Sequence, residues 1–175
     1  MNNTPHTNCL TLRLLHAAKG YKAVAFDIFD TLLKRDCAHP ADLFALMEVT
    51  HQAALGFAEA RVAAEAETRQ TLGREVTLAE IYAHPALRGT DPAAECAAEL
   101  AMIAPNRPVA QAAAACHARG QKVYAVSDMY LPKEQIEAML QKCGLDFLDG
   151  VFVSCEYRVQ KRSGKLFKLF LQQTA

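Results

Sequence analysis

The sequence predicts an α/β fold, in which a Rossmann-like parallel sheet carries helices on both of its faces. Three short apolar segments, 23–26, 122–126 and 150–153, each run directly into polar or acidic side chains. This pattern is typical of buried parallel strands that end at a polar edge. The second and third segments each follow a stretch with helical features, and this alternation indicates a doubly wound sheet. The composition, 51% hydrophobic and 22% charged, is that of a globular domain.

Proline and glycine mark the helices that connect these strands. Pro132 lies where the first turn of a helix would begin, and Gly144 lies where that helix would end. The alanine-rich segment 108–119 is followed by Gly120, which predicts a second helix with a glycine cap. The apolar residues within 166–171 suit one further helix near the end of the chain.

Residues 35–107 differ in character, because they are rich in alanine and glutamate and contain no strand pattern of comparable quality. Helix signals recur there: Pro40 at one start, Gly73 at one end, a capping box at Thr77–Glu80 and a third start at Asp91–Pro92. The segment is far longer than an ordinary connection between two strands. It is therefore predicted to be an all-helical insertion.

The chain is thus predicted to have an α/β core, residues 1–34 and 108–175, and a helical insertion, residues 35–107. An insertion after the carboxyl end of a strand lies above the crevice where open α/β sheets bind ligands, so we expect a cap or lid. The alternative is a structural decoration that is remote from any site.

Several classes of protein are disfavoured by the composition. The chain has 19 basic and 19 acidic side chains, so it lacks the basic excess that drives nucleic-acid binding. No apolar run approaches the roughly 20 residues of a membrane-spanning helix. The polar N-terminus lacks the pattern of a secretory signal, and the six scattered cysteines suit reduced thiols, so a cytoplasmic location is expected.

Two carboxylates, Asp27 and Asp30, follow the first predicted strand and are the first candidate site residues. Two carboxylates held close together resist ionising at the same time, so one can attack a substrate while its neighbour moves protons. A divalent cation would bind both of them and neutralise their repulsion. The alternative is a pair of solvated charges on a loop.

The other two strands end at further candidates. Ser127 ends the second strand, where its hydroxyl can donate to a phosphoryl oxygen or, alternatively, cap a turn. Lys161 follows the third strand, and a lysine there can neutralise anionic oxygens. On charge alone, Arg158, Arg162 and Lys165 are equally available.

Together these segments resemble the haloacid dehalogenase (HAD) superfamily. The run FDIFDTL at 26–32 is similar to its first motif, DxxDT, and Val126–Asp128 is similar to the second, in which Ser or Thr ends a strand. Lys161 falls where the third motif places a lysine. The phrases FDIFDTLL, SDMYLP and KRSGKLF further resemble a bacterial branch of HAD hydrolases, some of them joined to glycosyltransferases. The resemblance covers about residues 20–171.

The resemblance implies a Mg²⁺-dependent phosphatase of a small phosphorylated metabolite, such as a sugar phosphate. Asp27 would be the nucleophile that forms an aspartyl-phosphate, and Asp30 the general acid and then the base for water. Thr31 would support the turn and the phosphate site, Ser127 would bind the phosphoryl group, and Lys161 would offset negative charge. Mg²⁺ would lie between Asp27, the backbone carbonyl of Asp30 and the phosphate. An aspartate at position 30 favours phosphoryl transfer over dehalogenation, which needs no proton for the leaving group.

The sequence departs from the family at its end. The fourth motif is one or two acidic residues after a further strand, but residues 162–175 contain no Asp or Glu. Asp128 or Glu156 would be the substitutes for that metal ligand. Without the further strand, segment 23–26 becomes an exposed edge, which invites pairing with a second copy or a partner.

Three explanations of the missing motif are open. The chain is a fragment of a longer protein, or its missing strand comes from a partner, or it is a degenerate HAD-like module. In the last case its function would be that of a catalytically weak or inactive binding module.

Overall fold

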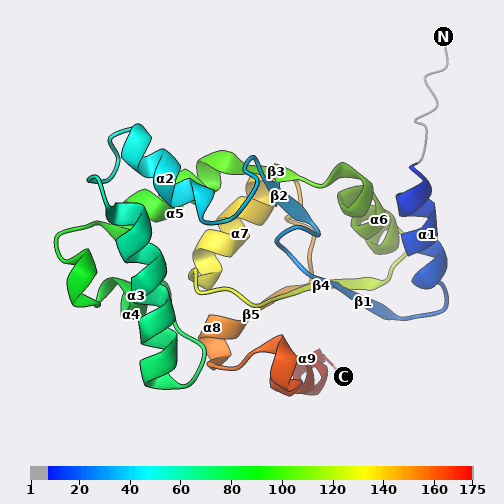
Figure 1. Ribbon diagram of the computed structural model, residues 1–175. Helices are drawn as coiled ribbons and strands as arrows, with labels where there is room; N and C mark the ends of the chain where they lie inside the picture. The colour runs from blue at the N-terminus through cyan, green and yellow to red at the C-terminus, as the bar shows by residue number, and fades with distance from the viewer. Residues whose placement is uncertain (1–7, 175) are drawn as a thin grey trace, which may run out of the picture.

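A three-stranded parallel sheet lies at the centre of the protein. The computed structural model describes residues 8–174. The sheet has the order β1-β4-β5, with β1 at Ala23–Phe26, β4 at Lys122–Ser127 and β5 at Gly150–Val153 (Figure 1). Both pairings are parallel. The three strands predicted from the sequence, and their parallel arrangement, are confirmed.

Helices cover both faces of this sheet (Figure 1). Helices α6 (Arg107–Ala118) and α7 (Lys133–Lys142) lie on one face, with α1 (Cys9–Ala17) packed against α6, and α9 (Lys165–Thr174) lies on the other. The alternation of side chains along β4 explains this arrangement. Val123 and Ala125 are buried in the hydrophobic cluster that includes α6 and α7, whereas Val126 is buried with Leu166 and Phe170 of α9. The sheet therefore has helical cover on both sides, as predicted.

The predicted helix ends agree with the structure. Helix α7 begins at Lys133, one residue after Pro132, and is followed by Gly144 with φ 72°. Helix α6 is followed by Gly120 with φ 80°. Glycine adopts this left-handed conformation without the steric cost that a β-carbon brings, so it can reverse the chain directly after a helix.

Between β1 and β4 lies a group of helices with a hydrophobic cluster of its own. These are α2 (Asp42–Val49), α3 (Phe57–Leu72), α4 (Leu78–Tyr82), the 3₁₀ turn Pro85–Leu87 and α5 (Pro92–Met102). Leu43, Phe44, Met47, Phe57 and Ile81 are among its buried side chains. None of the helices among residues 8–174 is long and apolar enough to cross a membrane.

Three of the four helix signals predicted within this group are present, whereas α2 begins at Asp42, two residues after the start predicted at Pro40. Thr77 and Glu80 form the reciprocal hydrogen bonds of a capping box at the start of α4. The Asp91 side chain accepts a hydrogen bond from the Ala93 N–H at the start of α5. Gly73 ends α3 in the left-handed conformation. Local capping chemistry was therefore sufficient to locate these helix ends.

A short antiparallel ribbon was not predicted. It pairs β2 (Leu33–Arg35) with β3 (Ile103–Pro105), and so brings together the two ends of the helical group. The expectation that segment 35–107 holds no strand was wrong at β3. Three residues are too few to show an alternating pattern, and the pairing depends on a partner far away in the sequence. The Arg35 guanidinium strengthens the junction by donating to both carboxylate oxygens of Glu99, at 2.9 and 3.0 Å.

The helical group is also attached to loops that follow the strands of the sheet. The Leu78 N–H donates to the Tyr130 carbonyl at 2.8 Å, and the Gln135 side chain donates to the Cys96 carbonyl at 2.6 Å. Arg158, which follows β5, forms an ion pair with Glu80 of α4. These contacts hold α4 and α5 beside the segments that follow the strands of the sheet (Figure 1).

Candidate functional site

The three strands present their carboxyl ends at one edge of the sheet. Phe26 lies opposite Ala125, and Ser127 lies opposite Val153. The residues that follow the strands therefore leave the sheet side by side. This register brings Asp27 and Ser127 to the same edge, as expected for parallel strands.

An ion pair connects the first of these strand ends to the loop after β5. The Lys161 ammonium lies 2.8 Å from Oδ1 of Asp27, and the same oxygen accepts the Ile28 N–H at 2.9 Å. The Asp27 side chain is 40% exposed and that of Lys161 is 22% exposed. Asp27 is thus an accessible carboxylate whose charge is compensated by an adjacent cation. The structure brings these two candidates into direct contact.

Asp128 holds the lysine loop in place. Its Oδ1 accepts the backbone N–H of Lys161 at 2.8 Å, across 33 residues of sequence. Asp128 and Glu156 were the expected substitutes for a missing metal ligand. In the structure Asp128 binds the backbone of the lysine loop, while Glu156 is exposed on the short helix α8 (Ser154–Tyr157).

Ser127 is almost fully buried at the end of β4, with 2% of its surface exposed. The turn after it is fixed by Ser154, whose hydroxyl accepts the Met129 N–H at 2.9 Å and donates to the Met129 carbonyl at 3.3 Å. Ser154 was not among the predicted site residues. Its position directly after the third strand is the signal in the sequence that could have indicated it.

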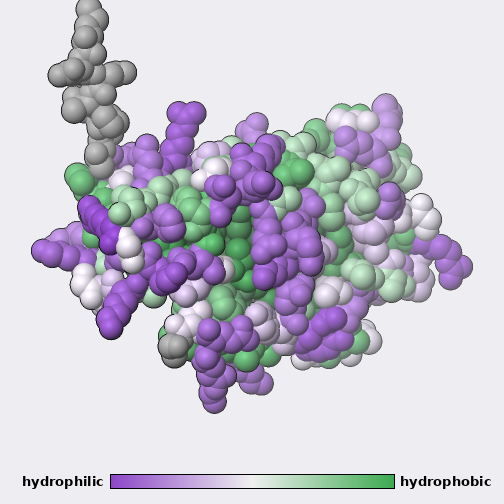
Figure 2. Space-filling view, turned by 180° about the vertical axis from the view of Figure 1, so that it is seen from behind, coloured by the Kyte–Doolittle hydropathy of each residue, from purple (hydrophilic) through white to green (hydrophobic). Residues whose placement is uncertain are grey.

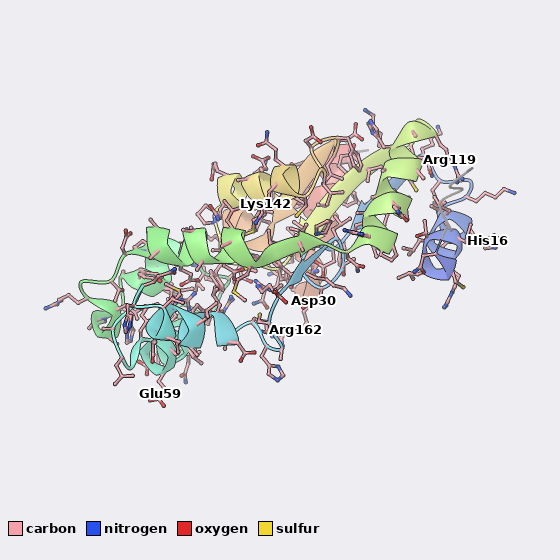
Figure 3. All side chains as sticks on the ribbon, turned by 90° about the horizontal axis from the view of Figure 1, so that it is seen from above. His16, Asp30, Glu59, Arg119, Lys142 and Arg162 are labelled. Carbon is pink, nitrogen blue, oxygen red and sulfur yellow. The ribbon has the colours of Figure 1, made fainter. Side chains whose placement is uncertain are left out.

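The turn after β1 carries Asp30 and Thr31. The backbone reverses there through hydrogen bonds from Thr31 and Leu33 to the Ile28 carbonyl, at 3.3 and 2.9 Å. Asp30 has φ 57°, a left-handed conformation in which aspartate is enriched among non-glycine residues. Its side chain is exposed, and Figure 3 shows it at the junction between the helical group and the sheet.

Asn106 supports this turn, although nothing in the sequence analysis pointed to it. Its side-chain amide donates to the Thr31 carbonyl at 2.7 Å, and its backbone N–H donates to the Leu32 carbonyl at 2.8 Å. Asn106 follows β3 directly, so the ribbon that joins the helical group also fixes the turn that carries Asp30. The contact spans 75 residues of sequence, and no local pattern signals it.

Asp30 interacts electrostatically with Arg35 at the start of the helical group, and Arg35 forms an ion pair with Glu99. Burial lowers the pKa of Arg35, but the hydrogen bond and charge of Glu99 outweigh it and raise that pKa, with a smaller contribution from Asp30. Arg35 also lies over the Phe29 ring, 4.1 Å from its centroid. Arg35 of β2 is therefore a positive charge beside the turn that carries Asp30.

The residues at this edge suit magnesium only with help from a substrate. No group of three or more His, Cys, Asp or Glu side chains within residues 8–174 is arranged to hold a metal ion. Asp27 nevertheless supplies a carboxylate and the Asp30 turn a backbone carbonyl, and Mg²⁺ commonly takes one or two carboxylates together with waters and substrate phosphates. These oxygens suit a Mg²⁺ site that a substrate phosphate completes, but they do not form a complete metal site without substrate.

Comparison with known proteins assigns no relative. No protein-family model matches the chain, and no curated protein matches it.

Proposed function

We propose that this chain has the core of a HAD-type hydrolase and acts as a Mg²⁺-dependent phosphatase on a small phosphorylated metabolite. The observation that carries the proposal is the 2.8 Å contact between Lys161 and Asp27, at the edge where Ser127 ends β4. An exposed carboxylate with a cation beside it and a hydroxyl on the neighbouring strand is a suitable arrangement for attack on phosphorus.

The proposed reaction has two steps. The Asp27 carboxylate attacks phosphorus, the bond from phosphorus to the ester oxygen breaks, and Asp30 gives its proton to the departing alcohol. Water then attacks the phosphorus of the aspartyl-phosphate, its proton passes to Asp30, and the bond from phosphorus to the Asp27 oxygen breaks. Inorganic phosphate leaves, and Asp27 is again a carboxylate. Ser127 binds the phosphoryl oxygens, and Lys161 balances the negative charge of Asp27 and the phosphate. Mg²⁺, when bound, would supply further positive charge at those oxygens.

In this proposal the helical group is the cap of the enzyme, residues 35–107, and residues 1–34 and 108–175 are its core. Support comes from the β2–β3 ribbon, through which both ends of the group join the sheet edge. Further support comes from the Leu78–Tyr130 hydrogen bond, which places α4 against the loop that follows Ser127. A cap in this place would exclude water from the reacting groups.

The test is hydrolysis of a panel of phosphate esters, including sugar phosphates, with Mg²⁺ and with EDTA. We expect metal-dependent turnover that Asp27→Asn abolishes, because the amide cannot attack phosphorus. Asp146→Asn is the matched control, since Asp146 is an exposed aspartate before β5, at the opposite end of the sheet. Metal-dependent turnover that survives Asp27→Asn would reject the proposal.

A second candidate function is a binding module that pairs through strand β1. Among the described strands β1 is an edge strand, and its Ala23 and Ala25 are exposed. Unpaired backbone groups at such an edge can accept a strand from another copy or from a partner, such as the strand that the family resemblance implies. Light scattering of the wild type and of Ala25→Lys tests this function. A stable dimer that the lysine dissociates, together with no turnover, would favour the module over the enzyme.

A further inference from the structure

A cationic cavity of about 490 Å³ lies between the end of α3 and the loop that joins α8 to α9. In Figure 1 these elements meet below the carboxyl ends of the strands, and Figure 2 shows hydrophilic side chains over much of this lower edge. Five cationic side chains line the cavity: Arg69, Arg74, Arg158, Arg162 and Lys165. Its volume is in the range of small-molecule sites.

The acidic residues around the cavity do not balance these cations. Arg69 pairs with Glu65 and Glu75, while Arg74 and Arg158 share a single carboxylate, that of Glu80.

Arg162 and Lys165, both exposed, form no ion pair with another residue of the described part of the chain. An excess of positive charge therefore remains at a concave surface, where it attracts anions.

The cationic side chains come from parts of the chain that are distant in sequence. Arg69 lies on α3 and Arg74 just after it, whereas Arg158 and Arg162 lie between α8 and α9. Guanidinium groups present a planar set of donors that matches phosphate oxygens. The fold thus gathers phosphate-binding groups that separately would be ordinary surface charges.

The cavity lies next to the proposed active site. Gln160 and Arg162 line it, and Lys161, which stands between them in the sequence, contacts Asp27 at 2.8 Å. The loop that forms one wall of the cavity therefore also supplies the cation at the nucleophile.

We propose that the cavity binds a second phosphate group of the substrate, so that the preferred substrates are small bisphosphates. This inference rests on the proposed phosphatase activity. One phosphate lies at Asp27 and is cleaved, while the other lies among Arg162, Lys165 and the neighbouring arginines and remains attached to the product. Because the second phosphate does not react, its contacts lower KM and orient the ester.

The kinetic test compares a hexose bisphosphate with the matching hexose monophosphate, using wild type and the double variant Arg162→Gln/Lys165→Gln. Loss of two charge-assisted contacts should raise KM for the bisphosphate at least about tenfold and change KM for the monophosphate less than about twofold. Lys168→Gln is the matched control, because Lys168 is exposed on α9 and lies outside the cavity lining. Equal effects on both substrates would overturn the proposal.

A binding test separates this inference from the activity itself. Isothermal titration calorimetry measures the binding of pyrophosphate in magnesium-free buffer to two variants. One carries Asp27→Asn alone, and the other carries Asp27→Asn together with the pair Arg162→Gln and Lys165→Gln. Circular dichroism first confirms that both variants are folded. Binding that the pair abolishes supports the cavity as a phosphate site, and it does so even if no ester is hydrolysed and the phosphatase proposal fails. Absence of pyrophosphate binding to Asp27→Asn would overturn the cavity proposal, whatever the activity.

Discussion

Replacing Glu95 with alanine is expected to lower the free energy of unfolding by about 3 kcal/mol. Glu95 on α5 and Arg61 on α3 form an ion pair whose two side chains are both 0% exposed. Arg61 donates to the two carboxylate oxygens at 2.7 and 2.8 Å, and the Tyr82 hydroxyl donates to one of them at 2.8 Å. Burial, together with the Glu95 carboxylate, raises the pKa of Tyr82, so this hydroxyl stays protonated and remains a donor.

The size of the expected loss depends on the Arg61 charge, which stays buried after Glu95 is removed. Removing one partner of a buried ion pair costs about 3–5 kcal/mol, because the other charge remains buried without compensation. Here Arg61 keeps the partly exposed Glu65 at 3.1 Å, and its guanidinium lies 4.8 Å from the Phe44 ring and 4.7 Å from the Tyr130 ring. These groups retain part of the stabilisation, which places the loss near the lower end. For a chain of this size, Tm would fall by about 6–12 °C.

Urea denaturation followed by circular dichroism measures the effect. Glu137→Ala is the matched control, because Glu137 pairs with Lys133 at 3.6 Å in a pair whose side chains are 50% and 42% exposed. The control should lose no more than about 0.5 kcal/mol. A loss below about 1 kcal/mol for Glu95→Ala would refute the reasoning that an isolated buried charge dominates the cost. Replacing both Arg61 and Glu95 with leucine should cost much less than Glu95→Ala alone, because no charge is then left buried.

Three further predictions concern the site and its attachments. Lys161→Gln should lower phosphate-ester turnover by at least about tenfold, because Asp27 then lacks its cation, and steady-state kinetics at saturating Mg²⁺ would measure it. Asn106→Ala should cost about 0.5–1.5 kcal/mol in urea denaturation through the lost hydrogen bond to the Thr31 carbonyl. Hydrogen bonds, the strongest from Arg74, lower the pKa of Glu80 to about 2 from 4.5. The wild type should therefore exceed Glu80→Gln in stability above pH 4.5, and thermal melts should show this difference shrink as the pH falls toward 2. A constant difference across that range would contradict the assignment.

Features encoded in neighbouring residues were predicted from the sequence. After Lys122, the strand segment 123–126 is apolar throughout, as expected of a strand that is covered on both faces of a sheet. The capping box at Thr77–Glu80 and the glycine after α7 locate helix ends, because a cap is a contact between residues within one turn. The meeting of Asp27 and Ser127 at one edge followed from the strand directions alone.

Contacts across the chain required the tertiary structure. On charge alone, Lys161, Arg158, Arg162 and Lys165 were equally available to neutralise anionic oxygens, and only the family resemblance favoured Lys161. The fold places Lys161 against Asp27, and it places the other three around the cavity. A charge pattern does not indicate in which direction a side chain points. Here the backbone of Lys161 is held by a hydrogen bond to Asp128, which lies 33 residues earlier in the chain.

The sequence by itself thus determined the three strands of the parallel sheet, most helix ends and the polar edge at which the candidate site lies. The ribbon that closes the helical group, the support of the Asp30 turn by Asn106 and the cationic cavity were decided only by the tertiary structure. Secondary structure and caps depend on interactions within a few residues, which periodicity and residue type reveal. A site depends on distances between residues that are far apart in sequence, and those distances exist only once the chain has folded.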